Sequence, residues 1–247
     1  MSFSADEHER YTRHILLKEI GGPGQQRLKA ATLALVGAGG LGAPAALYLA
    51  AAGAGRLRLI DDDAVSLDNL QRQIIFRTTD AGAAKVERAA QALTALNPNT
   101  RVEAVHARLN ESNAHGLLEG ADVVLDGTDD FAARFAVNAA CRELGIPLVS
   151  GAIGRWEGQV AVFTAGGPCY RCLVPEIPPE AETCARVGVV GPLPGVIGSM
   201  MALEAIKLIA QAGEPLIGRL LVYDALNAAA RTISLKRDPA CSVCGVE

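Results

Sequence analysis

Apolar runs and a glycine turn follow one another closely near the start of the chain. Residues 33–36 form a short apolar run that predicts a buried strand, and residues 43–52 form a longer one that predicts a helix. Between them, residues 37–42 read Gly-x-Gly-x-x-Gly, and a second apolar strand at 57–60 ends at Asp61. An acid about 20 residues beyond such glycines is typical of nucleotide-binding folds.

Each part of this pattern has a physical role beside a phosphate group. Glycines let the backbone come close to the phosphates, and a helix N-terminus faces them with free N–H groups. The carboxylate of Asp61 can accept hydrogen bonds from ribose hydroxyls. The alternative is a glycine turn that only packs a helix against a sheet. The glycines of the turn are Gly37, Gly39, Gly40 and Gly42.

The remaining pattern predicts an α/β protein with a Rossmann-like, mostly parallel sheet flanked by helices. Strands are expected at residues 101–109, 121–125, 147–150, 159–163, 220–223 and 231–236. Helices are expected at residues 83–96, 131–145 and 196–210. Before them, a short helix, a Gly-Gly-Pro-Gly turn at 21–24 and a second helix at 25–30 form an N-terminal arm.

Composition and charge favour one cytosolic enzyme-sized domain over residues 1–247. The chain is 50% hydrophobic and 20% charged, which allows a large core. A net charge of −4 and an aromatic content of 4% argue against a nucleic-acid partner. The uncharged run 30–55 is long enough for a membrane span, but its glycines and its proline indicate strand, turn and helix. We therefore expect a cytoplasmic protein that has no membrane segment.

We divide this domain into an arm at 1–30, a nucleotide-binding core at 31–165 and a C-terminal segment at 166–247. A polar stretch follows Asp61 and supplies hydrogen-bond donors near the expected phosphates. Its candidates are Asn69, Arg72 and Gln73. Lys85 lies in the first turn of the next helix, where a cation opposes the helix dipole. An anionic ligand nearby would explain that placement, although an ordinary exposed lysine remains the alternative.

Acidic residues also follow the buried strand at 121–125. Carboxyl ends of parallel strands form the ligand edge of such sheets, so Asp129 is a candidate magnesium ligand. The alternative is that Asp129 or Asp130 caps the helix that begins near Phe131. One of the two acids can cap the helix while the other binds metal.

Four of the six cysteines occur as two Cys-x-x-Cys pairs that lie far apart in the sequence. Such pairs in a cytosolic chain predict a structural zinc site, because four thiolates leave no open coordination position. The alternative, a redox-active dithiol, has no thioredoxin-like sequence around it. We expect Cys141 in the core. The predicted zinc ligands are Cys169, Cys172, Cys241 and Cys244.

The glycines and Asp61 fit NAD as well as ATP, and the remaining residues favour ATP. A dehydrogenase commonly carries a His or a Tyr-Lys pair after its cofactor half. Here no histidine lies beyond His115, and neither Tyr170 nor Tyr223 has a lysine four residues later. Phosphate-directed groups together with Asp129 suit a triphosphate with Mg²⁺.

The chain resembles the MoeB/ThiF/HesA family, the bacterial relatives of ubiquitin-activating enzymes. The resemblance implies ATP-dependent adenylation of the C-terminal glycine of a small ubiquitin-fold sulfur-carrier protein. It covers nearly the whole chain. The motifs that carry it are Arg10-Tyr-x-Arg13, Gly37-x-Gly-Gly-Leu-Gly42, Asp61, Ser66-Leu-x-Asn-Leu-Gln-Arg-Gln73, Lys85, Leu96-Asn-Pro98, Thr128-Asp129 and the two cysteine pairs.

By this resemblance, Asp61 would hold the ribose, and the phosphates would be held by Asn69, Arg72 and Lys85. Asp129 would place magnesium, and Arg13 would reach across a homodimer into the partner's site. From spacing alone, Arg10 and Arg13 indicate only a solvated helix face.

The sequence departs from the family pattern in two ways. Asp130 stands where the family usually has asparagine, so a changed metal preference is one consequence to test. No rhodanese-like extension follows Cys244, which implies a separate sulfur donor. Cys184 matches a position where relatives carry a cysteine that can bond the carrier covalently, and an unreactive loop thiol is the alternative.

Three questions stay open at this point. The molybdopterin-synthase small subunit is the favoured carrier because residues 150–159 resemble that branch, whereas residues 61–63 and 188–192 resemble the thiamine branch. The tRNA-modifying dehydratases of the same superfamily are an alternative, which the acidic balance disfavours. A non-catalytic nucleotide-binding module is another, which the intact Arg72, Lys85 and Asp129 disfavour.

Overall fold

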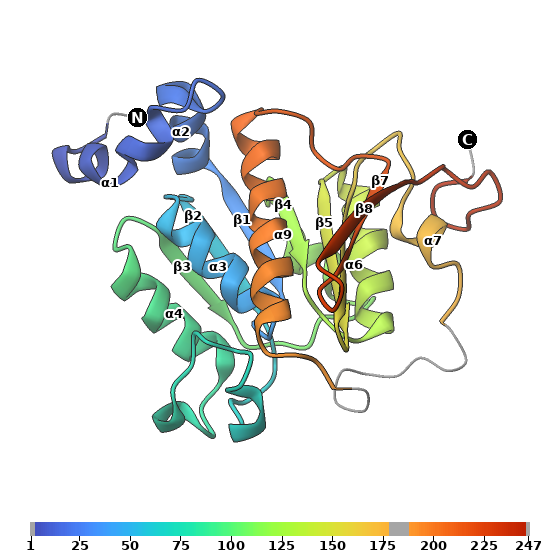
Figure 1. The fold of residues 1–247 in the computed structure, drawn as a ribbon, viewed down its shortest axis with the longest axis horizontal. Helices are drawn as coiled ribbons and strands as arrows, with labels where there is room; N and C mark the ends of the chain where they lie inside the picture. Colours follow the sequence, from blue (N-terminus) through green and yellow to red (C-terminus); the bar gives the residue numbers. More distant parts are fainter. Residues whose placement is uncertain (1–2, 178–187, 246–247) are drawn as a thin grey trace.

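The computed structural model describes residues 3–177 and 188–245, and an eight-stranded sheet forms its centre (Figure 1). The strand order is β3-β2-β1-β4-β5-β6-β7-β8. The first five of these run parallel, and the last three continue the sheet antiparallel. The strands are β1 (Thr32–Val36), β2 (Arg56–Ile60), β3 (Arg101–Val105), β4 (Val123–Asp126), β5 (Leu148–Gly154), β6 (Glu157–Phe163), β7 (Arg219–Asp224) and β8 (Ala229–Ser234).

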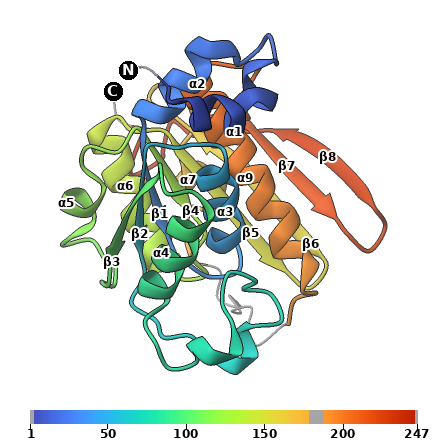
Figure 2. The same cartoon turned by 90° about the vertical axis from the view of Figure 1, so that its left-hand side faces the viewer.

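Helices cover both faces of the sheet, as the α/β prediction requires (Figure 2). One face carries α3 (Gly42–Ala51), α4 (Lys85–Leu96) and α9 (Pro192–Ala210). The other carries α5 (Ala114–Leu118), α6 (Phe131–Leu144) and α7 (Tyr170–Leu173). Strand β1 shows how one apolar run serves both cores, because Leu33 and Leu35 pack on the first face while Ala34 and Val36 pack on the second.

Two membrane questions are settled by packing. The uncharged run 30–55 forms β1, the glycine turn and α3 inside the domain. Helix α9 is 19 residues long and apolar enough to cross a membrane by length and composition. However, α9 packs against α3, β5 and β6, and half of its most apolar stretch of 18 residues is buried inside the protein. Such burial is typical of the core helix of a globular domain.

The N-terminal arm consists of α1 (Ala5–Ile15) and α2 (Gly21–Ala30). Its anchor is Tyr11, which is buried and whose hydroxyl accepts a hydrogen bond from Asn97 Nδ2 at 2.9 Å. Gly53 makes room for this ring: its φ is +85°, and a Cβ there would lie 2.4 Å from Tyr11 Cζ. The arm is therefore fixed to the loop that follows α4.

Several predicted boundaries were wrong. Helix α2 begins at Gly21, so the expected turn at 21–24 is its first turn, where Pro23 needs no N–H partner. Strand β3 ends at Val105 rather than 109, strand β5 runs on to Gly154, and β8 occupies 229–234 rather than 231–236. The short helices α5 and α7 and the 3₁₀ turns η1 (Leu67–Asn69) and η2 (Thr78–Asp80) were not predicted.

Candidate nucleotide site

A cleft of about 670 Å³ lies at the carboxyl ends of β1, β2 and β4, where the polar loops follow the strands. The structure brings together at this cleft almost every residue that the sequence singled out for a nucleotide. Gly42 is the exception, because it lies behind the turn. The predicted residues that line the cleft are Gly37, Gly39, Gly40, Asp61, Asn69, Arg72, Gln73, Lys85, Asp129 and Asp130.

The glycine turn brings its backbone close to the start of α3. Gly37 has a φ of +89°, which favours glycine. A Cβ on Gly42 would lie 1.8 Å from the carbonyl oxygen of Gly37, so only glycine fits there. This tight turn directs the N-terminus of the ten-residue helix α3 toward the cleft, an arrangement that suits phosphate.

Asp61 is held in place by two backbone donors. Its Oδ2 accepts from the N–H of Ala38 in the glycine turn at 2.7 Å, and its Oδ1 accepts from the N–H of Asp63 at 2.8 Å. Burial raises the pKa of Asp61, and the opposing effects of Lys85 and of these two N–H groups are smaller. The carboxylate is thus fixed at the cleft wall beside the turn.

Basic and amide groups converge on the same cleft from the segment after β2. Lys85 is buried, and its Nζ lies 2.6 Å from Asp63 Oδ2. Arg72 donates from Nη1 to the carbonyl oxygen of Asp68 at 3.0 Å. Gln73 is buried at the cleft wall, and its Oε1 has no hydrogen-bond partner among the described residues. An unpaired buried acceptor at a cleft wall suits a polar ligand.

The two acids that follow β4 have different positions. Asp130 is the N-cap of α6: its Oδ1 accepts from the N–H of Ala132 at 2.9 Å, and its Oδ2 pairs with Arg108 at 3.2 Å. Asp129 lines the cleft, and its side chain makes no hydrogen bond or ion pair with any of the described residues. The capping alternative therefore holds for Asp130 and leaves the carboxylate of Asp129 for a ligand.

Sequence reasoning missed several residues of the cleft wall. Arg134, Tyr170 and Arg108 line the cleft, although none carries a recognised motif. Arg134 lies one helical turn after Asp130 on α6, a spacing that puts both on the same helix face. That spacing was the available signal, and it is weak because exposed helix faces carry arginines at the same spacing.

The four paired cysteines meet in space despite their separation in the sequence. Their sulfur atoms all lie within 4.8 Å of one another, and two of the S···S distances are 3.6 and 3.3 Å. Tetrahedral zinc thiolates, with Zn–S near 2.3 Å, put sulfurs about 3.8 Å apart. Burial by itself raises the pKa of Cys241, but hydrogen bonds from the N–H groups of Cys244 and Val243 and from the thiols of Cys169 and Cys244 lower it to about 7. The tetrad can therefore hold a metal ion.

The remaining cysteines and Arg13 lie elsewhere. Cys141 is buried in the core, where burial raises the pKa of its thiol. Cys184 lies outside the described residues. Arg13 lines a second cavity, of about 490 Å³, between α1, α3 and α9. That cavity lies at the C-terminal end of α3, where Tyr48, Ala51 and Ala52 line it, whereas the nucleotide cleft lies at the N-terminal end of this helix. Arg13 is therefore not part of its own chain's cleft.

Comparisons with known proteins agree on one family. The model of the ThiF family matches residues 11–243. The chain is 48% identical over 247 residues to the SAMP-activating enzyme E1 of Haloferax volcanii, covering 99% of this chain and 92% of that one. It is 47% identical to the sulfur carrier protein adenylyltransferase of Thermus thermophilus (100% and 94% covered). It is 46% identical to the molybdopterin-synthase adenylyltransferase of Escherichia coli (98% of each).

Solved structures share the fold over nearly the whole chain. A crystal structure of Escherichia coli MccB with ATP matches with a TM-score of 0.82 at 25% identity, covering 96% of this chain and 74% of that one. Another structure of MccB, with MccA-N7isoASN, matches with a TM-score of 0.85 at 26% identity, covering 96% and 75%.

Proposed function

The chain belongs to the ThiF family, and from that premise we propose that it is an adenylyltransferase for the C-terminal carboxylate of a ubiquitin-fold sulfur-carrier protein. Relatives that match over nearly their whole length support this proposal by their names, which include sulfur carrier protein adenylyltransferase and molybdopterin-synthase adenylyltransferase. The structural match to MccB with ATP supports ATP as the nucleotide.

The proposed step is a substitution at the α-phosphorus of ATP. A carboxylate oxygen of the carrier's terminal glycine attacks the α-phosphorus and forms a new P–O bond. The bond from that phosphorus to the oxygen bridging the α- and β-phosphates breaks, and pyrophosphate leaves. No nucleophile from the enzyme takes part, so positioning and charge compensation account for the catalysis.

The residues of the cleft divide this work among them. Asp61 accepts from the ribose hydroxyls, and the glycine turn with the N-terminus of α3 lies along the phosphates. Arg72, Lys85 and Asn69 contact the phosphate oxygens and neutralise their charge. The carboxylate of Asp129 would hold Mg²⁺, which supplies further positive charge to the phosphates when bound.

The observation that carries this proposal is the convergence of Asp61, Lys85 and Asp129 on one cleft. The three residues come from different segments, after β2, at the start of α4 and after β4. Together they offer a ribose acceptor, a phosphate cation and a magnesium carboxylate. A domain that kept the fold only for docking would have no need of this set.

We also propose that the working unit is a homodimer in which Arg13 acts in the partner's cleft. The second cavity supports this, because its rim exposes the large side chains of Tyr48 and Leu203, each 59% exposed. A second copy of the chain would cover this apolar surface and give Arg13 a phosphate to contact.

The later sulfur chemistry and the metal complete the proposal. Zinc in the cysteine tetrad would be structural, because four thiolates fill its coordination shell. A separate protein would donate sulfur in the cytoplasm. Cys184 would bond the carrier only after adenylation, so Cys184→Ala should leave the first step intact.

The molybdopterin-synthase small subunit is the carrier that we favour, with the thiamine sulfur carrier as the second. The test is exchange of labelled pyrophosphate into ATP with each purified carrier. Exchange with the thiamine carrier alone would overturn the preference between carriers. Exchange with neither would overturn the adenylation proposal.

A further inference from the structure

Arg134 is a buried arginine at the wall of the nucleotide cleft. Its side chain is 6% exposed, and it extends from α6 toward the ends of β4 and β5. Its Nη2 donates to the carbonyl oxygens of Thr128 and Gly151, the latter at 2.8 Å, and its Nη1 donates to Ser150 Oγ at 3.4 Å. One guanidinium thus joins the loop after β4 to the neighbouring strand.

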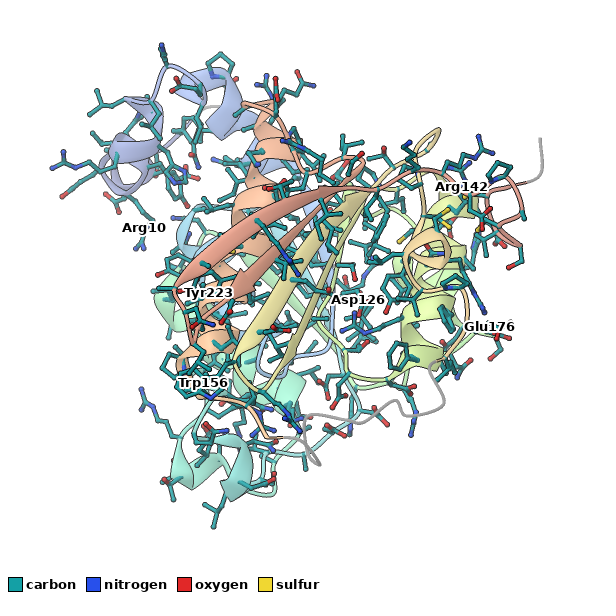
Figure 3. All side chains as sticks on the ribbon, turned by 45° about the vertical axis from the view of Figure 1, so that its right-hand side comes forward. Arg10, Asp126, Arg142, Trp156, Glu176 and Tyr223 are labelled. Atoms are coloured by element: carbon teal, nitrogen blue, oxygen red, sulfur yellow. The ribbon has the colours of Figure 1, made fainter. Side chains whose placement is uncertain are left out.

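Asp126 holds the same loop from the other side. This residue ends β4 and is 1% exposed, between the sheet and α6 (Figure 3). Its Oδ1 accepts from the backbone N–H of Thr128 at 3.0 Å and from Thr128 Oγ1 at 2.8 Å. Its Oδ2 lies 3.9 Å from Arg134 Nη1 and has no hydrogen-bond partner among the described residues.

Thr128 is therefore held at its N–H and hydroxyl by Asp126 and at its carbonyl by Arg134. The next residue is Asp129, whose carboxylate faces the cleft. The loop also lies against the glycine turn, because a Cβ on Gly37 would meet Gly127 and Thr128 at 3.3–3.4 Å. Small movements of Thr128 would therefore move the Asp129 carboxylate relative to the nucleotide.

From these contacts, and resting on the function proposed above, we infer that Asp126 and Arg134 form a positioning pair that fixes the Asp129 carboxylate for Mg²⁺·ATP. A buried ion pair contributes little net stability compared with apolar side chains of the same size. Stability alone therefore gives no reason for this pair. Groups that orient a metal ligand typically change metal affinity 10–100-fold when they are lost.

The segment that begins the first cysteine pair of the tetrad also contacts Arg134. The Arg134 guanidinium lies over the ring of Tyr170, 5.8 Å from its centroid. Tyr170 directly follows Cys169, and its N–H donates to Asn138 Oδ1 at 2.8 Å. Asp130, Arg134 and Asn138 follow one another at one-turn spacing on the same face of α6. This face thus connects the cleft loop to the cysteine tetrad.

The test compares two variants of the pair with a control from the same helix. Arg134→Lys keeps the charge but loses the fork that reaches Thr128, Gly151 and Ser150 together. Asp126→Asn keeps an acceptor for Thr128 and removes the charge opposite Arg134. Arg142→Lys is the control, because Arg142 lies two turns beyond Arg134 on α6 and does not line the cleft. Among the described residues its side chain donates to Thr164 O alone, at 3.4 Å. Figure 3 labels both Asp126 and Arg142.

The first readout is Mn²⁺ binding in the presence of ATP, followed by electron paramagnetic resonance, which needs neither carrier nor turnover. We expect both pair variants to weaken Mn²⁺ binding about tenfold or more, and Arg142→Lys to leave it unchanged. In pyrophosphate exchange, the Mg²⁺ concentration for half-maximal rate should rise by a similar factor, with partial recovery at high Mg²⁺.

A merely structural role would give a different result. The variants would then lose thermal stability, while the folded fraction would bind Mn²⁺ and use Mg²⁺ as the unmodified protein does. That result overturns the inference. If Arg134→Lys does not fold, Asp126→Asn decides by the same criterion. If the unmodified protein shows no carrier-dependent exchange, the proposed function fails, and the Mn²⁺ measurement still decides the role of the pair.

Discussion

Lys85 Nζ lies 2.6 Å from Asp63 Oδ2, in an ion pair whose lysine side chain is 6% exposed and whose aspartate side chain is 66% exposed. This asymmetry predicts that Lys85→Met separates activity from stability. Asp63 left alone stays hydrated, and Asp61 keeps its two backbone N–H donors, so the free energy of unfolding should change less than in the control below. Pyrophosphate exchange should fall on the order of 100-fold or more, because an oriented phosphate charge is lost.

Lys207→Met provides the matched control. Lys207 pairs with Glu204, whose side chain is 8% exposed and also accepts from the N–H of Leu216 at 2.7 Å. Removing this lysine leaves the buried Glu204 carboxylate without an opposite charge, so the free energy of unfolding should fall by about 2 kcal/mol. Exchange per folded molecule should be unchanged. If Lys85→Met keeps normal exchange, its phosphate role is wrong.

The cysteine tetrad predicts one zinc ion per chain. Cys172→Ser should lower the thermal midpoint and the zinc content together, because zinc binding at such a site is coupled to folding. The residues of the nucleotide cleft remain chemically intact in this variant. Metal analysis of freshly purified, active protein measures the content directly, and active protein without zinc would contradict the assignment.

The ion pair between Glu7 and Lys29 predicts that part of the stability of the N-terminal arm is lost in acid. A hydrogen bond from Lys29, whose Nζ lies 2.7 Å from Glu7 Oε1, lowers the pKa of Glu7 below its ordinary 4.5, and the N–H of Ser4 adds to this. A lowered pKa means stability that is present above pH 4.5 and is lost as pH falls through the folded-state value.

Glu7→Gln isolates this contribution. At neutral pH the free energy of unfolding of the variant should be about 1 kcal/mol lower, because the ion pair is lost and the capping box at Ser4 is weakened. The difference from the unmodified protein should shrink as pH falls below 4.5. Chemical denaturation at several pH values measures it, and a difference that is constant with pH would contradict the ion-pair account.

If Arg13 acts in the partner's cleft, two variants that are inactive alone should restore activity when they are combined in one dimer. Arg13→Ala and Lys85→Ala each remove one half of a site shared between two chains. Mixed and re-associated, they form dimers with one intact cleft, and about a quarter of the full activity should return. Sedimentation should show a dimer for each variant. An active monomer, or no recovery in verified mixed dimers, would contradict action across the interface.

The nucleotide half of the molecule was predictable because its signals are local. Burial on both faces makes β1 and β2 continuous apolar runs, and the close approach of Gly42 to Gly37 demands glycine. The four cysteines were predictable despite their separation, because two Cys-x-x-Cys pairs in one chain are typical of a metal site. The α/β fold and the family followed from these features.

What was missed depends on packing between distant segments. In the sequence, Arg134 cannot be told from an exposed helix arginine, because its contacts with Thr128 and Gly151 form only in the folded protein. The turn expected at residues 21–24 is the first turn of α2, and its Gly24 packs closely against Ala210 of α9, a contact that no local pattern predicts. Helices α5 and α7 are too short to show a period of 3.6 residues.

The central claim is that this chain transfers AMP to a carrier's terminal carboxylate, and exchange of labelled pyrophosphate into ATP tests it most directly. We predict exchange only with a carrier that keeps its terminal glycine. Asp129→Ala should lose exchange on the order of 100-fold or more, while Cys184→Ala should keep it. Exchange that is independent of the carrier, or absent with each purified carrier, would contradict the account.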